Sequence, residues 1–154
     1  MIRYSSTHTI NRPPHEVFET FLDAARFGDW TDMQGTMWDG DGPVQVGTTG
    51  SFRMPRGPFA GSVRMEVVEM VPDRRFVVRV AHPRFDWLSI SDLEASGAGT
   101  RMTYAGEISF RGWRRLLEPF MRGEVERGES REVQRLKALL EGAASTTGPT
   151  AGQS

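Results

Sequence analysis

Cysteine is absent from the 154 residues, and there is no excess of positive charge. The lack of cysteine excludes disulfides, thiolate metal ligands and a thiol nucleophile. Lys and Arg number 19 against 20 Asp and Glu, which gives a net charge of -1. Because sequence-independent nucleic-acid binding depends on neutralising phosphates, we expect no nucleic-acid partner. The absence of cysteine also fits a reducing compartment, so we expect a cytoplasmic protein.

Long apolar runs are missing as well. The opening stretch, MIRYSSTHTI, contains no apolar signal core. No segment approaches the roughly 20 apolar residues that a transmembrane helix needs. We therefore expect neither a secretory leader nor stable insertion into a membrane.

Recognisable metal and phosphate motifs are also lacking. The three histidines, His8, His15 and His82, do not form an H-x-x-x-H or H-E-x-x-H pattern. The glycines of VGTTG are not followed by the lysine of a phosphate-binding loop. The sequence therefore predicts no metal site and no cofactor.

The N-terminal segment predicts one strand and two short helices. Residues 3–10 are polar and β-branched, which is typical of a strand. Pro13 and Pro14 suit a helix start, where the missing N–H donors cost nothing. The next apolar residues have helical spacing: Val17, Phe18, Phe21 and Leu22. A second short helical turn over residues 24–29 leads to Trp30.

The central region has the alternating pattern of strands in a sheet with one apolar face. Glycines and a Pro-Asp turn separate the short runs. The alternating apolar sets are Phe52 and Met54; Val63, Met65 and Val67; Phe76, Val78 and Val80; and Met102, Tyr104, Gly106, Ile108 and Phe110. Residues 85–93 do not alternate cleanly, so the direction of Asp86 stays open.

Residues 112–141 change to a helical period. Their apolar stripe comprises Trp113, Leu117, Met121, Val125, Leu136 and Leu140. Residues 142–154 are rich in Gly, Ser and Thr and predict a disordered tail. A curved sheet with one apolar face needs a cover, which this helix can supply. We therefore predict one α+β domain over residues 1–141, in which about seven antiparallel strands wrap around a long C-terminal helix.

This order of segments resembles the START-like (SRPBCC) superfamily, which has the helix-grip fold, and within it the polyketide cyclase/dehydrase and lipid-transport group. The resemblance covers about residues 3–141 and rests on INRPPHEVFETFLD, DAARFGDW, VGTTGSF, GSVRMEVVEMVPDRRFVVRV, GAGTRMTYAGEI and RGWRRLLEPFMRGEVERGESREVQRLKALLE. It implies a cavity between sheet and helix for lipids, polyketides or other apolar molecules. It implies no reaction, since the superfamily includes carriers, cyclases and regulators.

The apolar sets predict the residues around such a cavity. They are Trp30, Phe52, Met54, Met65, Val67, Phe76, Met102, Tyr104, Trp113, Leu117 and Met121. The hydroxyl of Tyr104 could bind a ligand carbonyl, act as an acid, or bond to the backbone. His82 and Asp86 are weaker candidates for acid–base chemistry, and a surface turn is the alternative for His82.

Glycine and arginine residues leave further alternatives open. Gly106 could make room for a ligand or mark a bulge. Gly123 and Gly128 each weaken a helix by about 1 kcal/mol, which either a close contact with the sheet or space over a pocket would explain. The cluster Arg111, Arg114 and Arg115 could attract an anionic head group or a membrane surface, or form a solvated basic patch.

Three functions fit the sequence. The first is binding or transfer of a hydrophobic small molecule. The second is a cyclase- or dehydratase-type enzyme that uses the same cavity, which would need at least two polar groups converging there. The third is a protein-interaction module, which a large exposed apolar patch would favour. Whether the chain forms a homodimer stays open.

Overall fold

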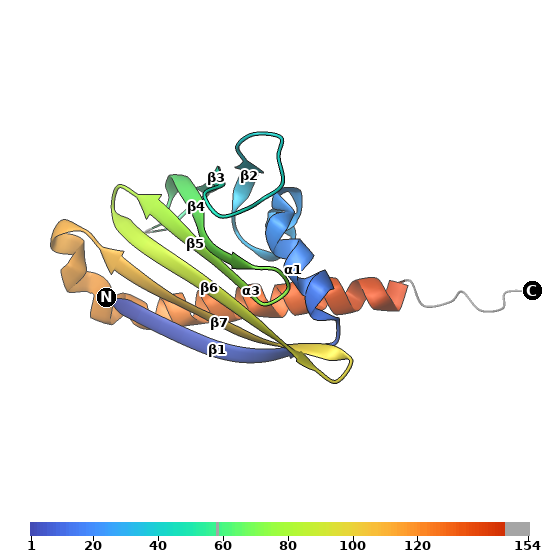
Figure 1. Ribbon diagram of the computed structural model, residues 1–154. Coiled ribbons are helices and arrows are strands. Elements are labelled where there is room, and N and C mark those ends of the chain that lie inside the picture. The colour runs from blue at the N-terminus through green and yellow to red at the C-terminus, as the bar shows by residue number, and fades with distance from the viewer. Residues whose placement is uncertain (58, 147–154) are drawn as a thin grey trace, which may run out of the picture.

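The computed structural model describes residues 1–57 and 59–146 of the chain. Over these residues the strands form one antiparallel sheet in the order β1-β7-β6-β5-β4-β3-β2 (Figure 1). The strands are β1 (Ile2–Ile10), β2 (Gln34–Trp38), β3 (Thr49–Met54), β4 (Gly61–Val71), β5 (Arg75–His82), β6 (Phe85–Ser96) and β7 (Gly99–Phe110). The helical elements are α1 (Pro14–Leu22), η1 (Ala24–Arg26), α2 (Phe27–Trp30), η2 (Gly112–Leu117) and α3 (Glu118–Thr146). The predicted α+β helix-grip architecture is confirmed.

The sheet buries one face against the helices. Along β4, Val63, Met65 and Val67 are buried while the alternating Arg64 and Glu66 are exposed. The first strand, β1, pairs with β7 although the two lie far apart in sequence. α3 runs along the sheet beside these two strands (Figure 1) and also contacts α2. The apolar core therefore lies between the sheet, α3 and the short helices.

An aromatic cluster fixes the short helices against the sheet. Phe21 on α1 stacks on Phe76 of β5 with ring centroids 6.0 Å apart. The ring centroid of Trp30, at the end of α2, lies 6.3 Å from that of Phe21. The rings of Phe18 and Phe76 are nearly perpendicular, with centroids 6.0 Å apart. Offset and edge-to-face ring contacts of this kind stabilise a core beyond the apolar area they bury.

The C-terminal helix differs from the prediction at both ends. The helical period predicted one helix over residues 112–141, whereas residues 112–117 form the 3-10 turn η2 and α3 begins at Glu118. Pro119 follows the first residue of α3, where its missing N–H is tolerated. The predicted disordered tail is wrong for residues 142–146, which continue α3, and its remainder lies outside the described residues. Strand β2 was not predicted, because Gly35 interrupts its short run.

Gly106 marks a close approach between β1 and β7. Tyr4 and Gly106 are direct partners in the register of the two strands. A Cβ on residue 106 would collide with the hydroxyl of Tyr4 and lie 2.8 Å from the carbonyl oxygen of Leu88. The space that the sequence left open for a ligand or a bulge is thus occupied by the Tyr4 side chain.

We expect Gly106→Ala to lower the free energy of unfolding by about 1–3 kcal/mol, the usual cost of overpacking a core. The backbone carbonyl of Leu88 cannot move away without disturbing the β6–β7 pairing. Denaturant unfolding followed by circular dichroism measures the change. Gly128→Ala is the control, since its Cβ would meet no atom within 4 Å and should stabilise the helix. Equal stability of both variants would contradict this account of Gly106.

Candidate functional site

A cavity of about 1150 Å³ lies between the sheet and the middle of α3. Its walls come from the α2–β2 segment, from β3 and the loop after it, from β6 and β7, and from α3. Lining residues include Thr31, Asp32, Gln34, Thr36, Phe52, Met54, Arg56, Phe59, Phe85, Trp87, Ile108, Met121, Val125, Gly128, Glu129, Arg131 and Glu132. A space of this size is large enough for a drug-sized or lipid-like molecule.

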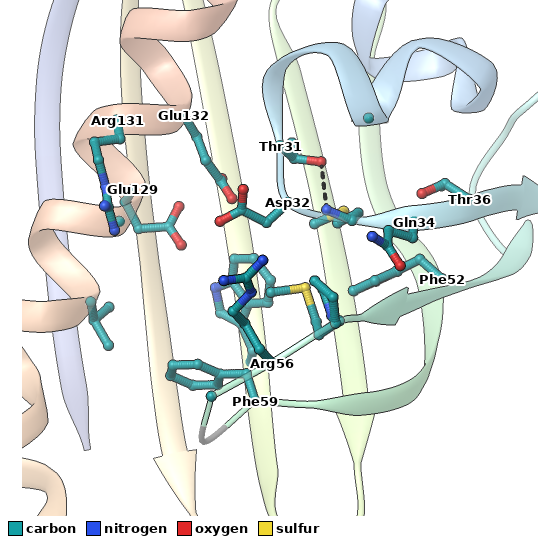
Figure 2. Close-up of a pocket in the computed structure, with 18 of the residues that line it drawn as sticks. Thr31, Asp32, Gln34, Thr36, Phe52, Arg56, Phe59, Glu129, Arg131 and Glu132 are labelled. Atoms are coloured by element: carbon teal, nitrogen blue, oxygen red, sulfur yellow. Dashed lines mark hydrogen bonds between the residues drawn. The ribbon is translucent and has the colours of Figure 1, made fainter.

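The cavity has an apolar side and a polar side. The sheet contributes buried apolar side chains, among them Phe52, Trp87 and Ile108. On the opposite side, Glu129 and Glu132 extend from α3 toward Asp32, which follows α2 (Figure 2). A bound molecule could therefore place an apolar body on the sheet and a polar group against α3.

Glu129 and Glu132 are the two buried acids of this wall. Each is only 9% exposed. They are three residues apart on a helix, so their side chains leave the same side of α3. In each, the Oε2 atom is buried and has no hydrogen-bond partner among the described residues. Buried carboxyl oxygens without partners are costly, which is why such groups mark sites that bind a ligand or a proton.

The surroundings of these acids favour their protonated forms. Burial raises the pKa of Glu129 to about 7, although the nearby hydroxyls of Tyr104 and Tyr4 act in the opposite direction. Burial also raises the pKa of Glu132 well above its ordinary value, and the charges of Glu129 and Asp32 add to this effect. Near neutral pH, the pair therefore retains protons that exposed carboxyls would have lost.

Two buried tyrosines lie behind the acids. The indole Nε1 of Trp87 donates a hydrogen bond of 2.8 Å to the hydroxyl of Tyr4. The rings of Tyr4 and Tyr104 are 6.2 Å apart. Burial and the charge of Glu129 raise the pKa of both phenols well above the ordinary value, so both remain neutral. They supply hydroxyl groups to the acids without adding charge.

A search against protein families agrees with this architecture. The model for polyketide cyclase / dehydrase and lipid transport matches residues 1–141. The chain belongs to this family. A comparison with curated proteins gives no match.

Solved structures share the fold of this family member at low sequence identity. A START superfamily protein from Mycobacterium smegmatis superposes with a TM-score of 0.77 at 9% identity, covering 93% of this chain and 99% of the other. DynU16, from the dynemicin biosynthetic locus, gives 0.68 at 18% identity, covering 93% and 48%. The Aha1 dimer from Colwellia psychrerythraea gives 0.66 at 17% identity, covering 92% and 97%. At these identities the likeness concerns the fold alone.

Three of the residues predicted from the sequence to bind a ligand line the cavity. Phe52, Met54 and Met121 line it. Six other predicted residues, which do not line it, pack in the filled core: Trp30, Met65, Val67, Phe76, Met102 and Tyr104. Trp113 and Leu117 lie outside, 65% and 39% exposed, because η2 turns them away from the stripe of α3. Contact of the three lining residues with a ligand stays a prediction.

The weaker catalytic candidates have other surroundings. His82 is buried and stacks on Phe85 with centroids 4.6 Å apart. Its Nδ1 accepts a hydrogen bond from the amide of Arg84, and burial lowers its pKa, so the ring supports the β5–β6 turn in its neutral form. Asp86 points to solvent and pairs with Arg111, whose Nε lies 3.1 Å away. Neither residue lines the cavity.

Glu129 and Glu132 were not among the site residues predicted from the sequence. A signal for them was nevertheless present. Val125, Glu129, Glu132, Leu136 and Leu140 follow one another at spacings of three or four residues, which puts the acids inside the apolar stripe of α3. Acids at stripe positions indicate a buried polar site.

Among the described residues, no group of His, Asp and Glu has an arrangement that could hold a metal ion, and no helix is long and apolar enough to span a membrane.

The raised pKa of Glu129 predicts a definite dependence of stability on pH. Its carboxyl titrates at about 7 in the folded chain, against an ordinary value of 4.5. The folded state therefore binds more protons than the unfolded state within this window, and the free energy of unfolding falls as pH rises through it. We expect Glu129→Gln to stabilise the protein by about 1–3 kcal/mol at about pH 8 and to change little at about pH 5.

Chemical denaturation of the wild type and variant at the two pH values tests this expectation. Glu126→Gln is the matched control, because Glu126 lies on the same helix but is exposed and pairs with Arg122. The same gain in both variants, or a gain at the lower pH only, would contradict the burial of an ionisable Glu129.

Proposed function

We propose that this protein binds an apolar small molecule in the cavity between the sheet and α3. The observation that carries the proposal is the cavity itself, about 1150 Å³ with a wall of buried apolar side chains. Membership in the polyketide cyclase / dehydrase and lipid transport family supports the same ligand class. Phe52, Met54 and Met121 are the residues expected to contact the apolar body of the ligand.

A second function has a specific observation in its favour. An enzyme of the cyclase or dehydratase type needs at least two polar groups that converge on the substrate, and Glu129 and Glu132 meet this requirement. Two coupled carboxyls in one site can divide the roles of acid and base, because they do not lose their protons together. A carrier needs no such pair for catalysis, so the two proposals differ in whether the bound molecule is chemically changed.

Native mass spectrometry of freshly purified protein tests the binding function directly. We expect a co-purified apolar molecule, released on denaturation and identified by its mass. If the protein is an enzyme, prolonged incubation with that molecule or its precursor should change the mass of the small molecule. A molecule that is recovered unchanged would favour the carrier.

Gly128 offers a way to block the cavity without disturbing the fold. It lines the cavity, and a Cβ at this position would meet no atom within 4 Å. We expect Gly128→Phe to weaken binding of the neutral fluorescent probe N-phenyl-1-naphthylamine by about tenfold, because the ring takes space from the ligand. The melting temperature should not fall, since the substitution also removes a helix glycine.

Gly123→Phe is the matched control for this experiment. Gly123 is a half-buried glycine of the same helix and lies outside the cavity. The atoms nearest to an added Cβ belong to the guanidinium of Arg127, at 3.4 Å or more. The Gly123→Phe variant should bind the probe like the wild type. Failure of the wild type to bind the probe, or equal losses in both variants, would contradict ligand binding in this cavity.

A further inference from the structure

We propose that Glu129 and Glu132 form a binding site for the cationic amine of a ligand whose remaining body is apolar. This inference rests on the proposed binding function and names the ligand class for the same cavity. Both acids line the cavity, and each has a buried Oε2 atom without a hydrogen-bond partner among the described residues. Figure 2 shows both carboxyls directed into the space that a ligand would occupy.

In the ionised form of the acids the unsatisfied atoms are acceptors, which restricts the chemistry of the partner that this form can bind. A carboxylate needs a hydrogen-bond donor, and an ammonium group offers up to three donors together with a compensating charge. An alcohol offers one donor and no charge. An anionic head group would add a third negative charge beside two buried acids, which is unfavourable at low dielectric.

The charges facing the acids leave them without a cation of their own. On the sheet side they face Tyr4 of β1 and Tyr104 of β7, which are neutral. Across the cavity, the charge of Arg135 acts to lower the pKa of Glu132, but the Arg135 guanidinium is bonded to Asp32 at 2.9 Å. The cavity also includes Arg56 and Arg131, but both side chains are exposed. Within the described residues, the buried wall thus lacks a positive group.

While the site is empty, bound protons neutralise the charge of the two carboxylates. An incoming ammonium group replaces these protons, so ligand binding should release them. Amine affinity should therefore rise with pH between about 5 and about 8, as the acids become able to ionise. An alcohol with the same apolar body should show no such dependence.

Three probes with one alkyl chain separate the head group from the apolar body. Octylamine, 1-octanol and octanoate are titrated into the full chain by isothermal calorimetry. We expect octylamine to bind at least about tenfold more tightly than octanol at about pH 8, and octanoate to bind most weakly. Glu129→Gln and Glu132→Gln should remove this advantage of octylamine over octanol. Glu126→Gln, outside the cavity, should behave like the wild type.

The outcomes distinguish the two proposals. Equal binding of all three probes, or a preference for octanoate, would overturn the amine site while leaving the apolar binding function intact. No binding of any probe would overturn both. Since Gln has the size of Glu and cannot ionise, both variants are expected to fold, and their circular dichroism spectra verify this.

A second inference comes from the surface at the start of α3. Trp113, Leu116, Leu117 and Phe120 are exposed, with Leu116 at 76% and Phe120 at 83%. Arg114 and Arg115 lie between Trp113 and Leu116 in the sequence, and the guanidinium of Arg114 lies 5.0 Å from the centre of the Trp113 ring. Residues 111–122 contain four arginines, of which Arg111 pairs with Asp86 and Arg122 with Glu126. Arg114 and Arg115 form no salt bridge among the described residues, and the one acid of this stretch, Glu118, is buried. We call Trp113, Leu116, Leu117 and Phe120 with Arg114 and Arg115 the apolar–arginine surface.

We infer that the apolar–arginine surface docks on an anionic lipid membrane. Exposed aromatic and leucine side chains beside arginines match an interface of acyl chains and negative head groups. A second copy of the chain would bring like-charged arginines together, and therefore fits less well. The surface also adjoins the cavity, because Met121 and Glu124 on the next turn of α3 line it. Docking would place the cavity beside the membrane.

Vesicle co-sedimentation of the full chain tests this inference. We expect binding to vesicles of phosphatidylcholine mixed with phosphatidylglycerol, little binding to phosphatidylcholine alone, and a loss at high salt. The double substitution Leu116→Ser and Phe120→Ser should weaken binding to the mixed vesicles by about tenfold. Val46→Ser is the control, since Val46 is 57% exposed and belongs to the connection between β2 and β3, not to residues 111–122.

Two results would overturn the membrane inference. The first is equal sedimentation of the wild type and the double variant with the mixed vesicles, which includes the case in which neither protein sediments. The second is a dimer in light scattering that the same double substitution dissociates, which would assign the surface to a second copy.

Discussion

The attachment of α3 at both of its ends is the constraint on which the site depends. At the start of the helix, the carboxylate of Glu118 accepts a hydrogen bond of 2.8 Å from the amide of Phe110 and pairs with the amino group of Met1. Near the other end, Arg12 donates to the carbonyl oxygen of Leu140 at 3.1 Å. Because the ends are held by these bonds and by apolar packing, the middle of α3 can face a cavity instead of filling it.

The middle of α3 contains residues that lower the stability of the fold. Two buried acids and Gly128 occupy a stretch where the stripe pattern would otherwise place apolar side chains. Each of these residues costs stability, through desolvation or through weak helix propensity. Residues that break the local rules of a fold and are supported elsewhere often lie at functional sites.

The sequence predicted the fold well because its signals are local. Alternation along β4 and β7 and the helical period after residue 112 depend only on neighbouring residues. The site was harder to predict, because the curvature of the sheet decides whether an inward side chain meets the core or the cavity. Phe52 and Met65 share one face of the sheet, yet only Phe52 lines the cavity. Predicting the buried acids Glu129 and Glu132 requires the assumption that a position in the apolar stripe of α3 can hold a polar residue.

Gly123 and Gly128 have a further consequence for the motion of α3. Each weakens the helix by about 1 kcal/mol relative to alanine, and both lie between the two attached ends. Local opening of a helix is most frequent where its backbone is least stable. The amides around residues 123–128 would then exchange hydrogen faster than those near Leu136, which is fully buried. The segment of α3 that forms the wall of the cavity would be the most easily opened part of the helix, so a ligand could enter without unfolding of the sheet.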